Sequence, residues 1–168
     1  MITSISTDEF RSVATDQQRG VLDELLSDPT LPTDRGATWH AVASVLLATG
    51  DGRVLLARNR RGWGTVGGHV EPADASLRAT VVREAREEIG LLLTEDALVP
   101  LSFIADEAPV DPGCAHWDFC FVRVLNDAVP ATAGSDVSEA RWFPLDALPD
   151  MNGHMRQHLD AVRLMLSR

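Results

Sequence analysis

The chain has 168 residues, the length of one ordinary domain, and 45% of them are apolar, which suffices for one buried core. Fifteen basic residues against 25 acidic ones give a net charge of −10, so the basic surface that nucleic-acid backbones require is not expected. No apolar run approaches the roughly 20 residues of a membrane helix, and no signal peptide is recognisable. The two cysteines cannot build a disulfide framework or a four-thiolate zinc site. We therefore expect a cytoplasmic globular protein.

The N-terminal segment is predicted to be helical. Apolar residues recur at helical intervals over residues 6–28, and Gly20 and the pair Thr15–Asp16 mark the points at which this segment would divide into two short helices. We interpret residues 1–36 as a helical extension and residues 37–168 as the domain that follows it.

Strands and helices alternate over the rest of the chain. Strands are expected at 39–48 and 53–58, joined by the turn pair Asp51–Gly52, and a helix at 75–89 with Gly90 at its C-terminal cap. Between them, residues 60–72 are glycine-rich and lack a periodic pattern. The remaining predicted elements are strands at 98–108, 116–126 and 139–145 and a closing helix at 154–168. This order predicts a layered α/β domain with a mixed sheet.

The helix at 75–89 carries the most informative residues. Glu84, Glu87 and Glu88 fall within about 100° of arc on one helical face. Their mutual repulsion would be relieved by a bound cation, and hard ions such as Mg²⁺ and Mn²⁺ prefer oxygen ligands. Arg83, four residues before Glu87, is placed to hold one carboxylate. The alternative is a solvated, charged helix face.

A glycine-rich segment directly precedes this helix and favours the cation site. Gly64, Gly67 and Gly68 allow close backbone approach, so that their amides and carbonyls can meet a metal ion or a phosphate. Alone, these glycines would indicate only a turn. Because a helix with three carboxylates on one face follows them, they indicate a binding site for a metal ion or a phosphate.

The stretch GGHVEPADASLRATVVREAREEIGL resembles the Nudix box, whose pattern is Gly-x5-Glu-x7-Arg-Glu-U-x-Glu-Glu-x-Gly-U, where U is aliphatic. Gly68 begins the match, and residues 83–91 follow the second half of the pattern. The first half departs from it, because Asp74 stands at the first glutamate position and one additional residue separates it from the arginine. A later segment, Trp142 to Leu145, also resembles members of this family.

The resemblance implies a Nudix-type α/β/α sandwich and Mg²⁺-dependent hydrolysis (Mn²⁺ being possible) of a phosphoanhydride bond. It implies that Glu87 and Glu88 are the principal metal ligands and that Glu84 is a further ligand or the base that activates water. The carbonyl of Gly67 would complete the metal shell, and Arg83 would orient the glutamates. Because many Nudix enzymes are homodimers, a dimer is expected as well.

Substrate contacts are predicted outside the glutamates. Strand alternation puts His116 and Asp118 on the face opposite the core aromatics. There they either face the substrate, with Asp118 as an additional metal ligand or base, or form a hydrogen-bonded polar pair. Trp63 either stacks on a base or packs beneath the glycine loop. The backbone of Gly68 is a candidate phosphate contact, and His69 is expected to be a surface imidazole.

The resemblance implies a pyrophosphatase that acts on a nucleoside diphosphate linked to another moiety. Nucleoside triphosphates, nucleotide sugars, ADP-ribose and dinucleoside polyphosphates all remain compatible. The expected partner is a small nucleotide-type substrate, with neither nucleic acid nor membrane. The alternative is a Nudix-fold module that senses a nucleotide without hydrolysing it, which the altered first half of the box would favour.

Overall fold

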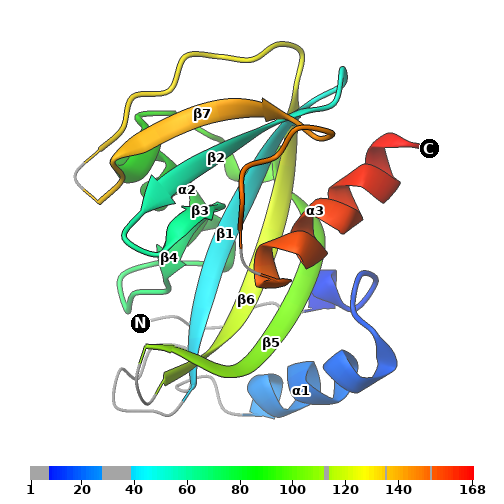
Figure 1. Cartoon of the computed structure of the whole chain (residues 1–168). Coiled ribbons are helices and arrows are strands. Elements are labelled where there is room, and N and C mark those ends of the chain that lie inside the picture. Colours follow the sequence, from blue (N-terminus) through cyan, green and yellow to red (C-terminus); the bar gives the residue numbers. More distant parts are fainter. Residues whose placement is uncertain (1–7, 28–38, 112–113, 135, 152) are drawn as a thin grey trace.

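The structure is a computed structural model that describes residues 8–27, 39–111, 114–134, 136–151 and 153–168 (Figure 1). Within these residues a seven-stranded mixed sheet forms the centre of the molecule. Its strands are β1 (Trp39–Thr49), β2 (Arg53–Asn59), β3 (Gly62–Gly64), β4 (Val66–His69), β5 (Val99–Asp111), β6 (Cys114–Leu125) and β7 (Glu139–Pro144).

The long strand β1 organises the sheet. It pairs with β6 in parallel along its whole length, and β5 follows β6 in antiparallel register. Its other edge is shared, because β4 pairs with the first half of β1 and β2 with the second half. β3 and β7 extend the sheet from β2. The glycine-rich segment is thereby fixed directly beside the centre of the sheet.

Helices cover both faces of the sheet (Figure 1). One core lies between the sheet and α2 (Leu77–Ile89), which contributes Leu77, Val81, Ala85 and Ile89. The second core lies between the opposite face and α3 (Gly153–Leu166), which contributes Met155, Leu159 and Val162. This is the α/β/α sandwich with a mixed sheet that the sequence predicted.

The N-terminal segment packs onto the first of these cores. A short 3-10 helix, Asp8–Phe10, precedes α1 (Asp16–Ser27), so the chain divides at Thr15–Asp16 as predicted. Phe10 is fully buried, with its ring edge-on to Phe119 and Phe121 at centroid distances of 5.2 and 4.9 Å. The side chain of Gln18 donates to the carbonyl of Phe103 on β5. The described part of residues 1–36 therefore shares its apolar contacts with the sheet, while the domain boundary at residue 37 stays a prediction.

The helix α2 begins and ends where its capping residues dictate. The hydroxyl of Ser76 accepts from the amide of Ala79, and Gly90 adopts the left-handed conformation at φ 70° that closes the helix. The expected start at residue 75 is two residues early. The segment 60–72 contains β3 and β4, which were not predicted, because glycine-rich strands show no alternation of apolar and polar residues.

None of the helices in the described ranges is both long enough and apolar enough to span a membrane.

Candidate functional site

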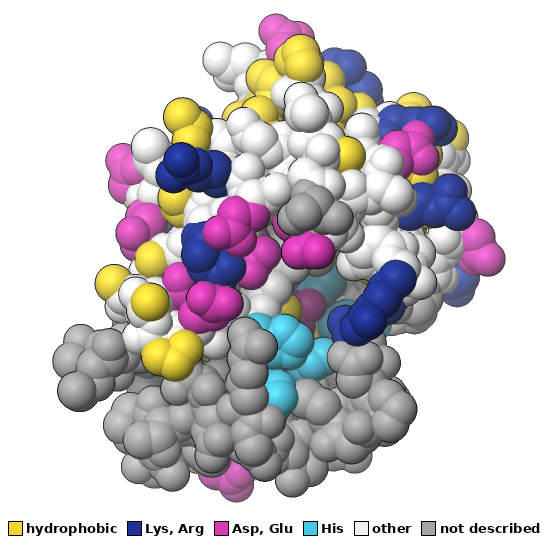
Figure 2. Space-filling model, turned by 90° about the vertical axis from the view of Figure 1, so that its left-hand side faces the viewer, with side chains coloured by type: hydrophobic (Ala, Val, Ile, Leu, Met, Phe, Trp, Pro, Cys, Tyr) yellow, Lys and Arg dark blue, Asp and Glu magenta, His cyan; other side chains and the backbone are white. Residues whose placement is uncertain are grey.

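A cavity of about 630 Å³ opens beside β4 and the C-terminal half of α2. Its lining combines glycines of the loop with acidic, basic and imidazole side chains. These include Gly67, Gly68, His69, Glu88, His116, Asp118, His154, Trp63, Arg60 and Arg61. Figure 2 shows histidines and acidic side chains gathered around the hollowed part of this face. The cavity brings together residues from six separate segments of the chain.

Arg83 connects the acidic residues beside this cavity. Its Nη1 lies 2.7 Å from Glu84 Oε1 and 3.3 Å from Glu87 Oε2. Its Nη2 donates to the carbonyl of His69 at 3.1 Å. The paired carboxylates, Asp74 first, raise the pKa of Arg83, so the guanidinium stays charged. The guanidinium of Arg83 thereby fixes Glu84 and Glu87 relative to the glycine loop.

Asp74 holds Arg83 in place and closes the loop before the helix. The guanidinium donates to both carboxylate oxygens, at 3.1 and 2.9 Å. Asp74 Oδ2 also accepts from the hydroxyl of Thr80 at 2.8 Å and from the amide of Glu71 at 2.9 Å. Burial alone would raise the pKa of Asp74, but Arg83 and these donors lower it. Asp74, the residue that departs from the box pattern, therefore positions Arg83. The sequence alone left the role of Asp74 open.

Glu88 lies deepest of the three glutamates. Its side chain is buried against the loop, and Oε2 accepts from the amide of Gly67 at 3.0 Å. Burial raises the pKa of Glu88 to about 7, and the nearby charge of Glu84 acts in the same direction. Burial also raises the pKa of Glu84, against the influence of Arg83. Glu87 differs, because 57% of its side chain is exposed.

Two glycines let the backbone approach the glutamates closely. A Cβ added to Gly68 would lie 2.7 Å from the carboxyl carbon of Glu84. Gly134, whose amide donates to the carbonyl of Glu88 at 2.7 Å, packs directly on the last turn of α2. The positions of Glu84 and Glu88 therefore depend on residues without side chains.

His116 and Asp118 lie on the face of β6 that was predicted, opposite the buried rings of Phe119 and Phe121. Both line the cavity, and Asp118 is embedded in hydrogen bonds. One oxygen accepts from the hydroxyl of Ser44 at 2.9 Å. The other lies 3.3 Å from Nε2 of His154.

His158 on α3 completes the network around Asp118. Its Nε2 lies 3.0 Å from the carboxylate, and its Nδ1 lies 2.7 Å from the hydroxyl of Ser102. Burial would raise the pKa of Asp118, but His158 and His154 outweigh it and hold that pKa well below its ordinary value. Burial would lower the pKa of His158, but Cys120 and Asp118 raise it well above 6.5. The network therefore places an ionised carboxylate at the wall of the cavity.

Trp63 lines the cavity and also packs on its neighbours. Its ring meets Phe143 edge-on at a centroid distance of 4.9 Å. The guanidinium carbons of Arg58 and Arg141 lie 5.9 and 6.0 Å from the ring centroid. The structure thus shows packing contacts on a side chain that also lines the cavity, and the stacking of a base on Trp63 stays a prediction.

The chain has five histidines, and all of them lie in two groups. Within each group one ligand atom per residue lies within 4.8 Å of the others; the groups are His40, His69 and His116, and Asp118, His154 and His158. His40, His154 and His158 were not singled out from the sequence, because β1 and α3, which carry them, lie outside the Nudix box. A signal for these groups in the sequence is weak: the chain has five histidines, and their elements become neighbours only in the folded sheet.

Comparison with known proteins gives a consistent result. The family model described as NUDIX domain matches residues 38–162. The NAD-capped RNA hydrolase NudC of Pseudomonas aeruginosa is 33% identical over 128 residues, which covers 74% of this chain and 43% of that protein. The chain thus spans less than half the length of this curated relative.

Solved structures share the fold at lower identity. The MutT NUDIX hydrolase from Burkholderia pseudomallei aligns with a TM-score of 0.61 at 24% identity, covering 74% of this chain and 98% of that one. The NUDIX domain of Shewanella oneidensis NrtR, complexed with ADP ribose, aligns with a TM-score of 0.65 at 19% identity, covering 86% and 97%. The arrangement of sheet and helices is therefore common to all three.

Proposed function

Because the chain belongs to the Nudix family, we propose that it hydrolyses the diphosphate linkage of a nucleoside diphosphate joined to another moiety, with Mg²⁺ or Mn²⁺. The observation that supports this most strongly is the arrangement of Glu84, Glu87 and Glu88, which Arg83 and the glycine loop hold in place and of which Glu88 lines the cavity. Hydrolases of this family act on phosphoanhydride bonds, and two of the three relatives described above, from Pseudomonas aeruginosa and Burkholderia pseudomallei, are named hydrolases.

The acidic residues fit a hard divalent cation. Two carboxylates are tethered by Arg83 and the third by the amide of Gly67, so their oxygens are fixed before a ligand arrives. Burial raises the pKa of both Glu84 and Glu88, because Arg83 and the amide of Gly67 only partly offset the lost hydration of these carboxylates, and a bound cation would favour both charged forms. Oxygen donors of this kind suit Mg²⁺ and Mn²⁺. We assign Glu87 and Glu88 as ligands together with the carbonyl of Gly67, and Glu84 as either a further ligand or the base that activates water.

Each charged side chain of the site has a separate role near the reacting phosphates. When bound, the cation neutralises phosphate oxygens and lowers the pKa of water. Arg83 keeps Glu84 and Glu87 in place, and Asp74 keeps Arg83 in place. Glu84 is the base candidate, since its burial favours accepting a proton.

The cavity supplies the substrate contacts. Arg60 and Arg61 line it and bring positive charge to a substrate that carries several negative ones. The backbone of Gly68 and the polar side chains of His116 and Asp118 face the same space, and the ring of Trp63 offers a flat surface at its wall. A volume of about 630 Å³ lies within the range of nucleotide-sized ligands.

Names of the relatives define the first substrates to test. One is an NAD-capped RNA hydrolase and one was solved with ADP ribose, so a panel would hold NAD, NAD-capped RNA, ADP-ribose, a dinucleoside polyphosphate and nucleoside triphosphates. Given the net charge of −10, we propose that the small molecules are turned over faster than the capped RNA.

The decisive experiment compares wild type with Glu87→Gln, which keeps the size of an exposed side chain and removes its charge. Release of phosphate would be followed with Mg²⁺ or Mn²⁺, after phosphatase treatment of products that need it. Metal-dependent turnover that falls at least about 100-fold in the variant supports the hydrolase. Full activity of Glu87→Gln would refute the assignment.

The alternative, a sensor without turnover, has a distinct outcome. It requires nucleotide binding by calorimetry together with no turnover of any panel member. The chain retains all three glutamates of the box, which favours hydrolysis. The homodimer and the cytoplasmic location stay predictions from the sequence, and light scattering of the purified chain would test the first.

A further inference from the structure

His40, His69 and His116 meet because of how three strands pair. In the parallel register of β1 and β6, His40 is the direct partner of His116. In the antiparallel register of β1 and β4, His69 is the partner of Val42, two residues after His40 and therefore on the same face. Backbone pairing alone thus gathers three imidazoles on one face of the sheet.

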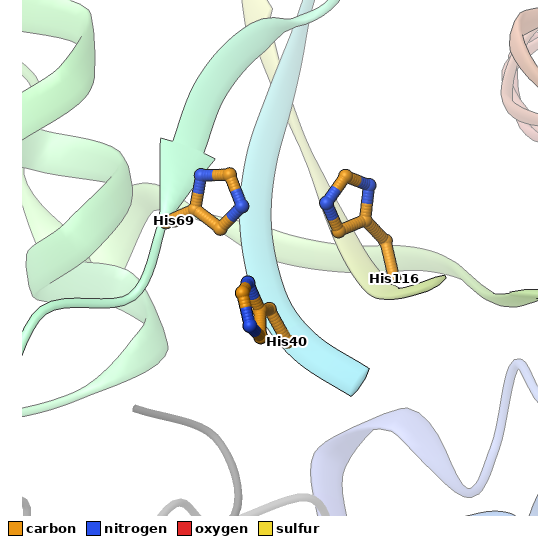
Figure 3. A group of neighbouring side chains, drawn as sticks. All are labelled: His40, His69 and His116. Atoms are coloured by element: carbon orange, nitrogen blue, oxygen red, sulfur yellow. The ribbon is translucent and has the colours of Figure 1, made fainter. Parts of the chain in front are cut away.

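The three side chains point toward one another (Figure 3). One ring nitrogen from each lies within 4.8 Å of the others, and the ring centroids are separated by 5.1 to 6.4 Å. Zn²⁺ bound to imidazole at about 2.0–2.1 Å in tetrahedral geometry places its ligand nitrogens about 3.3 Å apart. The nitrogens would have to approach one another by at most about 1.5 Å to reach that geometry.

The donor atoms differ in kind from those of the glutamate site. Imidazole nitrogens suit Zn²⁺, Co²⁺, Ni²⁺ and Cu²⁺, whereas carboxylates and carbonyls suit Mg²⁺ and Mn²⁺. Three protein ligands are also the number found where zinc keeps one open coordination position. Because His69 and His116 line the cavity, that position would be open to a water molecule or an anionic oxygen of a cavity ligand.

We propose that His40, His69 and His116 form a binding site for a transition-metal ion of the Zn²⁺ class at the wall of the cavity, separate from the carboxylate site for Mg²⁺. His116 is buried, while His40 and His69 are half-buried, which leaves the ion a route from solvent. The proposal does not depend on the hydrolytic activity, because its test needs no substrate.

The test is a titration of the metal-stripped full-length chain with Co²⁺ in excess Mg²⁺, which occupies the carboxylates. Visible absorption of tetrahedral Co²⁺ is the readout, and displacement by Zn²⁺ gives the relative affinity. We expect one ion per chain and a loss of affinity of at least about 100-fold in His40→Ala. Circular dichroism would verify that the variant is folded.

Two further variants separate this site from its neighbours. His154 lines the cavity as well but belongs to the second group, with Asp118 and His158. His154→Ala should therefore leave Co²⁺ binding unchanged. His40→Cys supplies another zinc-class ligand and should restore binding, with a thiolate charge-transfer band added to the spectrum. The proposal is overturned if excess Mg²⁺ abolishes Co²⁺ binding, if His40→Ala binds as wild type does, or if His154→Ala removes the binding.

Discussion

Glu88 provides a direct test of the energetics of the site, through its replacement by glutamine. The carboxyl has an ordinary pKa of 4.5, and burial raises it to about 7 in the folded protein. The folded state therefore holds the proton more tightly than the unfolded state does. Folding stability falls as the pH rises from 4.5, and the full penalty is present above pH 7. Glutamine cannot ionise, so this part of the pH dependence disappears in Glu88→Gln.

The magnitude follows from linkage. With pKa values of 4.5 and about 7, ionisation costs the folded state about 1.5 kcal/mol near pH 5.5 and about 3.5 kcal/mol near pH 8.5. The stability of Glu88→Gln relative to wild type should thus increase by about 2 kcal/mol between these pH values. Any constant cost of placing an amide beside Gly67 cancels in this comparison.

The assay is urea unfolding of both proteins in EDTA at about pH 5.5 and about pH 8.5. Glu87→Gln is the matched control, because its side chain is 57% exposed and its removal should change the pH dependence little. Adding Mg²⁺ should stabilise wild type more than Glu88→Gln, since the cation offsets the charge. A relative stability of Glu88→Gln that is the same at both pH values would refute the reasoning.

Three further predictions concern single residues. Gly68→Ala should displace the Glu84 carboxylate and lower kcat at least about 10-fold with a small change in Tm. The control Gly50→Ala lies outside the cavity lining, with nothing within 4 Å of an added Cβ, and should leave kcat unchanged; equal effects would contradict the proposed clash. Phe10→Ala should cost about 3–5 kcal/mol in urea unfolding, because the ring is fully buried, and a loss under about 1 kcal/mol would show that the segment before α1 does not share the core. Asp74→Asn should lower stability by about 2 kcal/mol at neutral pH, because it removes one of the three carboxylates that pair with Arg83 and weakens its charge-assisted hydrogen bonds. Since the pKa of Asp74 is lowered on folding, the difference from wild type should shrink as the pH falls below about 3.8 in thermal melts.

Much of the fold is readable from local patterns. The predicted strands from residue 39 onward, the helix ending at Gly90 and the two-faced strand around Phe119 all match the structure closely. Alternation and capping are properties of neighbouring residues, so sequence reveals them. The strands β3 and β4 escaped prediction because glycine carries no side chain to alternate.

The candidate site divides in the same way. Glu84, Glu87 and Glu88 share a helical face by spacing alone, and Arg83 lies within reach of them by spacing alone. By itself, therefore, the sequence determined the family, the sandwich of helices on a mixed sheet, and the acidic helix that carries the proposed metal ligands.

Only the tertiary structure decided what surrounds those glutamates. Asp74 became the partner of Arg83 through the turn before the helix, and Glu88 became buried through the pairing of β4 with β1. The pairing of β1 with β4 and β6 placed His40 beside His69 and His116, residues far apart in the chain. Strand register and the packing of α3 on the sheet depend on contacts over the whole chain, and no local spacing encodes them.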